Sequence, residues 1–222
     1  MDWEAALTAA RERHAERLDA SLDEIERPDL QLSAVASASW AAGLALLMLD
    51  RPGEATEELL RAADEYETSW EAAPPESWGR PIAALRCRLL AGDANGAAEI
   101  GRRVLGDGAA SSASPFALYA AVLARLALGQ DREAAEHAAR LGTYAGFPAD
   151  VAAALLALAS GDRGRYGEAL ESVLASFETR KEFLEDVRVA DTALVLEALA
   201  SVRGMERRPS SPMLPPSPGS SA

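Results

Sequence analysis

The chain has 222 residues, a formal net charge of −13, a single cysteine and few aromatic residues. This length predicts one domain with enough residues to bury a core. The negative charge argues against direct binding of DNA, RNA or an anionic membrane surface, because phosphates would repel the protein. One cysteine excludes a disulfide framework within the chain and a thiolate metal cluster. Alanine, leucine, glutamate and arginine are abundant and strand-forming runs are absent, so we expect an all-α fold.

The first residues show no charged segment followed by an apolar leader. The longest apolar stretch, Trp40 to Leu49, has ten residues, which is too short to span a bilayer. We therefore expect no membrane segment and a reduced, cytoplasmic setting.

Apolar residues recur at helical spacing along most of the chain. The first expected helix covers 3–26. The second, 33–49, is rich in small residues and is expected to be buried on more than one side. Further helices are expected at 53–70, 82–91, 95–105, 115–129, 132–142, 149–160, 166–182 and 190–203. About ten helices with short connections are typical of packed helical hairpins.

Two segments are expected to add little to the core. Residues 106–114 are mostly glycine, alanine and serine and predict a flexible connection. The tail, 205–222, holds five prolines among serines, so we expect a disordered or surface-draped segment after a single domain spanning 1–204. Removing the tail is therefore expected to leave the melting temperature nearly unchanged.

A helix end, a short turn and an alanine that opens the next helix recur along the chain. The marker alanines are 42, 37 and 35 residues apart, a period typical of stacked antiparallel helical hairpins. Since small residues let helices approach closely, we expect all four to be buried between helices. These alanines are Ala55, Ala97, Ala134 and Ala169.

Residues 33–180 resemble tetratricopeptide repeats. Trp40 opens one helix of the first copy, and Ala55, Leu59 and Ala62 occupy the family's small-large-small positions in the next. Gly101 at the middle position of the second copy and the variable spacing depart from the family pattern. The resemblance implies an α-α superhelix.

Charge is distributed unevenly along the sequence. Residues 50–76 carry a net charge of −7 and residues 80–105 a net charge of +3. Two interpretations stay open: solvated helix faces, or a patch that orients a partner. The candidate partner-binding residues are Glu57, Glu58, Glu65, Glu67, Trp78 and Arg80.

Each of these candidates has an expected behaviour. Replacing the four glutamates with glutamine is expected to preserve folding and to slow association with a basic partner. Trp78 either packs the junction between two hairpins or anchors a partner.

No catalytic or metal-binding motif is found. Neither His14 nor His137 follows a glutamate by three residues, which excludes the paired Glu-x-x-His motif of di-iron bundles. Cys87, inside an apolar helix, is expected to be a buried thiol. Asp191 is interpreted as the N-cap of the last helix, with Asp186 as the alternative. We expect no catalytic residue, no metal and no cofactor.

The closing part of the chain carries a second resemblance. It includes Phe177-Glu178-Thr179-Arg180, then Phe183 to Val187 and Val189 to Ala200, followed by Arg203-Gly204-Met205. This region looks like the closing region of an all-helical family of immunity proteins from bacterial polymorphic toxin systems. The junction Ser77-Trp78-Gly79-Arg80-Pro81-Ile82 is similar in style.

This second resemblance implies a non-catalytic protein that binds and neutralises a toxin domain, and the negative charge would suit a basic one. The alternative is a small-molecule-binding or regulatory helical domain with a pocket in its concave face.

Overall fold

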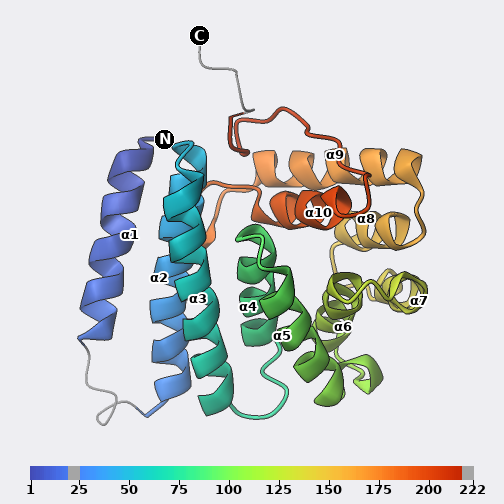
Figure 1. The fold of residues 1–222 in the computed structure, drawn as a ribbon, viewed down its shortest axis with the longest axis horizontal. Helices are drawn as coiled ribbons and strands as arrows, with labels where there is room; N and C mark the ends of the chain where they lie inside the picture. Colours follow the sequence, from blue (N-terminus) through green and yellow to red (C-terminus); the bar gives the residue numbers. More distant parts are fainter. Residues whose placement is uncertain (20–25, 217–222) are drawn as a thin grey trace.

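The computed structural model describes residues 1–19 and 26–216, and the regular structure within them is entirely helical (Figure 1). Ten α-helices in these residues confirm the all-α expectation. They are α1 (Trp3–Leu18), α2 (Pro28–Met48), α3 (Pro52–Ala72), α4 (Gly79–Leu90), α5 (Ala94–Gly106), α6 (Pro115–Ala127), α7 (Asp131–Leu141), α8 (Ala149–Ala159), α9 (Arg163–Thr179) and α10 (Asp191–Ser201), with short 3₁₀ turns η2 (Ala109–Ser111) and η3 (Leu184–Asp186).

Most bounds lie close to the expected ones. The largest differences lie around Arg27-Pro28: α1 ends at Leu18, although a helix was expected through residue 26, and residues 20–25 are outside the described part. The next helix begins at Pro28, five residues before the expected start, because proline is well tolerated in the first turn of a helix.

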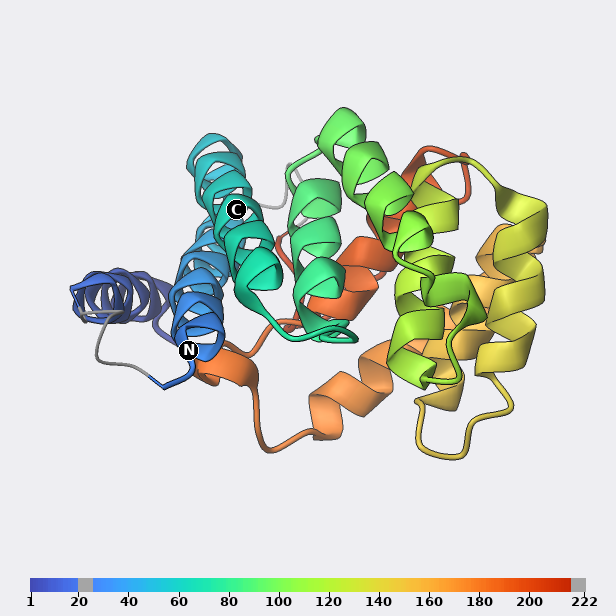
Figure 2. The same ribbon diagram turned by 90° about the horizontal axis from the view of Figure 1, so that it is seen from below.

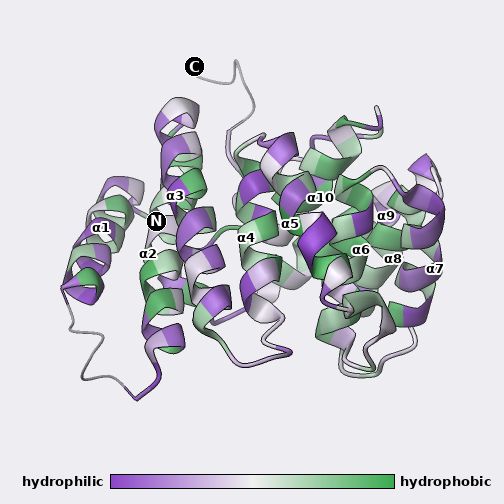
Figure 3. Ribbon diagram, turned by 60° about the horizontal axis from the view of Figure 1, so that its bottom comes forward, coloured by the Kyte–Doolittle hydropathy of each residue, from purple (hydrophilic) through white to green (hydrophobic). Residues whose placement is uncertain are grey.

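Successive helices pack against one another in chain order from α1 to α9. Figure 2 shows α1 to α7 following one another in an arc, and hydrophobic residues concentrate on the sides where helices meet (Figure 3). α10 departs from this order, because it packs against α4 as well as against α8 and α9. The end of the chain therefore returns to the middle of the array, while the tetratricopeptide resemblance stays a prediction.

The recurring turns share one backbone feature. Each places a residue with positive φ two positions after the last residue of a helix: Asp50 (56°), Gly92 (73°), Gly129 (69°) and Gly161 (68°). A left-handed residue at this position ends a helix by redirecting the chain, and glycine adopts it without steric cost. The sequence pattern thus corresponds to one repeated way of ending a helix.

The marker alanines are buried, as expected. Ala55, Ala97 and Ala134 are at most 1% exposed, and Ala169 is 9% exposed.

Among the described residues one helix, α2, is long and apolar enough to span a membrane, by length and composition alone. In the structure 67% of its most apolar 18-residue stretch is buried, since α1 and α3 pack against this helix. Counting only the uninterrupted apolar stretch from Trp40 underestimated the length of this apolar helix.

The segment 106–114 was expected to be a flexible connection that adds little to the core. The structure differs from this expectation. Residues 109–111 form η2, and the Ala109 side chain is fully buried.

The described part of the tail also packs on the domain. Met205, Met213 and Leu214 are 7–8% exposed, and the Ala190 N–H donates to the Met213 carbonyl at 2.9 Å. The expectation that the tail buries too little apolar surface to matter is therefore wrong for these residues.

We predict that Gly43→Ala destabilises the protein whereas Gly53→Ala does not. A Cβ atom at Gly43 in α2 would lie 2.7 Å from Leu59 Cγ in α3, and none of the described atoms lies within 4 Å of one at Gly53. We expect Gly43→Ala to lower the free energy of unfolding by about 1–3 kcal/mol, as overpacking does. Urea unfolding of both variants is the measurement, and equal midpoints would contradict the close approach of α2 and α3.

We also predict that truncation after Gly204 lowers the melting temperature, contrary to the sequence-based expectation. Losing the buried Met205, Met213 and Leu214 side chains should cost roughly 2–5 kcal/mol, or about 5–15 °C. The double variant Met213→Ser/Leu214→Ser should show part of this loss, and Ser210→Ala, at an exposed position, should show none. An unchanged melting temperature in the truncated protein would mean that the tail only lies on the surface.

Candidate functional site

A cavity of about 650 Å³ opens between the helices and the chain that follows α9. Its wall comes from α2, α3, α4, α6, α8, the α7–α8 connection, residues 180–184 and the start of α10. We call it the central pocket. The lining includes Leu30, Tyr66, Arg80, Arg86, Phe116, Tyr119, Arg180, Leu184 and Thr192. An adjoining cavity of about 220 Å³ shares Tyr66, Arg86 and Arg180 with it and extends to Trp40 and Phe177.

Arg86 of α4, which lines the central pocket, forms an ion pair with Asp191 of α10, which lines the adjoining cavity. Burial by itself lowers the pKa of Arg86, but the Asp191 carboxylate together with Tyr119, Cys87 and Tyr66 raises the pKa above its usual value, so the guanidinium stays charged. Its Nη2 also donates to Thr192 Oγ1 at 3.3 Å. Its Nε is buried and has no hydrogen-bond partner in the described part of the chain. Part of this guanidinium is thus left without a hydrogen-bond partner at the pocket.

Two tyrosines, Tyr66 and Tyr119, present polar groups in the same pocket. They are 5% and 9% exposed, and burial raises the pKa of both hydroxyls. The hydroxyls therefore stay protonated at neutral pH. Neither forms a hydrogen bond with another of the described residues, so both can serve a ligand.

The mouth of the central pocket is apolar. Leu30, Phe116 and Leu184 line it and are 52%, 61% and 59% exposed. These are three of the six large apolar side chains that are exposed in residues 1–19 and 26–216. A concentration of exposed apolar residues around a cavity is typical of an interaction site.

Residues 180–190, which we call the return segment, close one side of the pocket. The carboxylate of Glu185 accepts hydrogen bonds from Arg13 Nε (2.7 Å), Arg17 Nη1 (2.6 Å) and Ser37 Oγ (2.7 Å). Burial by itself raises the pKa of Glu185, but the hydrogen bonds from Arg17 and Ser37, together with the charges of Arg17 and Arg13, hold the pKa below its usual value. Glu185 thus fixes Leu184 at the pocket.

Arg180 begins the return segment. Its guanidinium lies 4.0 Å from the centre of the Phe177 ring, a cation–π arrangement. The side chain is exposed and forms no ion pair within the described residues.

Most of the glutamates predicted to bind a partner form ion pairs within the chain. Glu58 is 5% exposed and accepts from Arg11 Nε at 3.1 Å and Arg61 Nη1 at 2.8 Å. Glu65 Oε1 lies 2.7 Å from His14 Nε2. These two carboxylates attach α1 to α3 or bind within α3, and they are not available to a partner.

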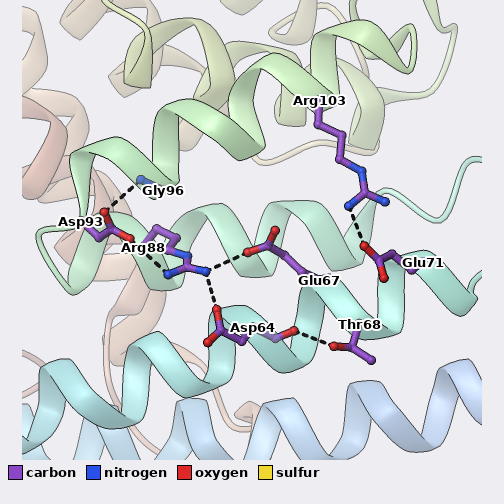
Figure 4. A network of polar contacts seen from close by, with 8 residues as sticks. All are labelled: Asp64, Glu67, Thr68, Glu71, Arg88, Asp93, Gly96 and Arg103. Carbon is purple, nitrogen blue, oxygen red and sulfur yellow. Dashed lines mark hydrogen bonds and ion pairs between the residues drawn. The ribbon is translucent and has the colours of Figure 1, made fainter.

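The acidic and basic stretches also bind each other (Figure 4). Arg88 of α4 pairs with Asp64, with Glu67 at 3.0 Å and with Asp93 at 3.1 Å. Arg103 of α5 pairs with Glu71 in the same way, at 3.3 Å. Of the four candidate glutamates, Glu57 is the one that is exposed and has no ion pair with a described residue.

Trp78 and Arg80 have different roles. Trp78 is 7% exposed within the core, so it packs the junction and does not present a surface anchor. Arg80 lines the central pocket, where it binds the Asp29 carboxylate at 2.5 Å and the Ser69 hydroxyl at 3.0 Å. Arg80 is therefore the predicted site residue that lies at the pocket.

Sequence reasoning missed the other pocket residues. Arg86 and Arg180 were hidden among many arginines, and Phe116 and Leu30 were indistinguishable from core residues of their helices. Asp191 is the first residue of α10 and pairs with Arg86, so its main role is not the expected cap. Asp186 lies in η3 and does not cap α10.

The reactive groups that sequence reasoning considered are engaged in the core or with neighbours. Cys87 is fully buried, and burial raises the pKa of its thiol to about 12, so it is a protonated core residue as expected. His137 Nδ1 lies 2.6 Å from the Glu133 carbonyl of its own helix. Within the described ranges no group of three or more histidine, cysteine, aspartate or glutamate residues is arranged to hold a metal ion.

Comparison with known proteins found no matching family model, no similar curated protein and no similar solved structure.

We predict that Glu58→Gln destabilises the protein and that Glu57→Gln leaves its stability unchanged. The first change removes the charge that Arg11 and Arg61 bind at a buried position, at a cost of about 1–3 kcal/mol. The second alters an exposed side chain on the same helix. Thermal unfolding of the two single variants is the measurement.

For the same reason the quadruple glutamine variant should lose stability, contrary to the sequence-based expectation. A Glu58→Gln protein as stable as Glu57→Gln would show that the ion pairs of Glu58 contribute nothing.

Proposed function

We propose that this protein binds another protein without catalysing a reaction, and that the central pocket receives part of the partner. The observation that carries the proposal is the position of Leu30, Phe116 and Leu184, which are exposed at the mouth of a cavity of about 650 Å³. Covering these side chains on binding would remove apolar surface from water, which favours association.

The two segments that resemble immunity proteins both contribute to the central pocket. The junction 77–82 supplies Gly79, Arg80 and Ile82, and the closing region supplies Arg180, Leu184 and Thr192. Segments about a hundred residues apart in the sequence therefore meet at one cavity. This supports a specific form of the proposal, in which the partner is a toxin domain that the protein neutralises.

The overall charge supports a basic partner, although not through the site first expected. Three of the four candidate glutamates are bound to arginine or histidine within the chain. The net charge of −13 still creates a long-range field that attracts a basic protein. Attraction would therefore arise from the whole molecule, and contact from the pocket.

A small-molecule ligand is the second candidate function. A volume of about 650 Å³ lies within the range of ligand pockets, and Arg86, Tyr66 and Tyr119 are the kind of convergent polar groups that fix a ligand. The exposed apolar mouth favours the protein partner, because a small ligand would leave Phe116 and Leu30 in water.

We predict that Phe116→Ser weakens partner binding at least about tenfold, whereas Val202→Ser does not. Both side chains are large, apolar and exposed, at 61% and 79%, but only Phe116 lines the pocket. Losing a buried aromatic contact typically costs 1–3 kcal/mol or more. The partner is first captured from the native host by tagged protein and identified, and the affinity is then measured with both purified proteins.

The matched pair separates the outcomes of this test. Equal affinities of the Phe116 and Val202 variants for the purified partner would place the interface elsewhere. Full activity of a captured toxin in the presence of this protein would exclude neutralisation while leaving binding intact.

A further inference from the structure

The lining of the central pocket carries three arginines, Arg80, Arg86 and Arg180, and no acidic residue. The whole chain has a net charge of −13. Asp29 pairs with Arg80 and Asp191 with Arg86, so Arg180 is the arginine that leaves this lining a net positive charge among the described residues, and this local sign favours an anionic group.

The three arginines differ in what they can still bind. Arg80 is held by Asp29 and Ser69, and Arg86 by Asp191 and Thr192. Arg86 keeps a buried Nε that lacks a partner within the described residues. Arg180 is exposed at the edge of the pocket, stacked on Phe177 and without an ion pair to any described carboxylate.

The neighbouring groups favour a carboxylate over a cation. Tyr66 and Tyr119 keep their protons because burial raises the pKa of both hydroxyls, so each can donate a hydrogen bond to an anion. A guanidinium can bind a carboxylate through two parallel hydrogen bonds. A lysine or arginine entering here would meet the uncompensated charge of Arg180, find no acidic side chain among the described lining residues and lose its hydration.

We propose that the central pocket binds a segment of the partner protein in which an acidic side chain stands beside apolar ones. The carboxylate pairs with Arg180, near Arg86 and the tyrosine hydroxyls, and the apolar side chains cover Leu30, Phe116 and Leu184. The proposal rests on the proposed function and adds the chemistry of the contact. Charge complementarity and the apolar mouth are the observations that select this occupant.

Three amidated and acetylated peptides test the proposal: Ser-Phe-Asp-Leu-Ser, the same peptide with asparagine, and the same peptide with lysine. The reporters are the methyl NMR signals of Leu30 and Leu184, with Val202 as a signal outside the pocket. We expect the aspartate peptide to bind about tenfold tighter than the asparagine peptide and the lysine peptide to bind weakest. The preference should shrink as salt is raised, because Arg180 is exposed.

A matched pair of protein variants tests whether Arg180 is the residue that recognises the carboxylate of the peptide. Arg180→Gln should reduce the preference for aspartate over asparagine to about twofold or less. Arg102→Gln, at an exposed arginine of α5 outside the pocket, removes the same charge and should keep the tenfold preference. Neither side chain is buried, so both variants should fold.

Several results would overturn the inference. Equal binding of the aspartate and asparagine peptides, both weakened by Phe116→Ser, would exclude recognition of a carboxylate. The proposed function, binding of a protein at the pocket, would still hold. The absence of a methyl shift with any peptide up to about 5 mM would also overturn the inference. The proposed function would then be tested separately, by the affinity of the Phe116 variant for the purified partner. Binding of N-acetylphenylalanine as tight as that of the aspartate peptide would favour a small ligand over a protein segment.

Discussion

The carboxylate of Glu185 holds the two ends of the helical array together, and the central pocket depends on it. Its partners Arg13 and Arg17 belong to α1 and Ser37 to α2, at sequence separations of 172, 168 and 148 residues. Glu185 and Asp186 both adopt a left-handed backbone, with φ of 55° and 57°, which costs energy for residues other than glycine. The ion pairs offset this cost, so the return segment keeps a conformation that places Leu184 at the cavity.

The second link is the pair between Arg86 and Asp191, which joins α4 to α10. This pair lies where the last helix leaves the chain-order packing and meets the middle of the array. Burying an ion pair is worthwhile only when most of its hydrogen bonds are satisfied, yet Arg86 Nε has no partner among the described residues.

Much of the fold could be predicted from the sequence, because it depends on local patterns. Helical periodicity, first-turn prolines and the residues after each helix, such as Gly92 and Gly129, act within one turn of chain. The pocket could not be predicted, since its wall combines residues from six helices that only tertiary packing brings together. The tail was misjudged for the same reason: Met213 and Leu214 are two apolar residues among prolines, and only the fold shows where they are buried.

Charge shows the difference between sequence and structure most clearly. The acidic and basic stretches look like two patches in the sequence, but Arg88 and Arg103 cross from α4 and α5 to neutralise carboxylates of α3. What remains is a net negative field around the molecule and, at the central pocket, the charge of Arg180, which pairs with no described carboxylate. At physiological salt the field acts over about 8 Å, so in the proposed complex it would govern approach, whereas Arg180 would act at contact. A basic protein that offers an acidic and apolar segment satisfies both requirements, because encounter and docking respond to different parts of its surface.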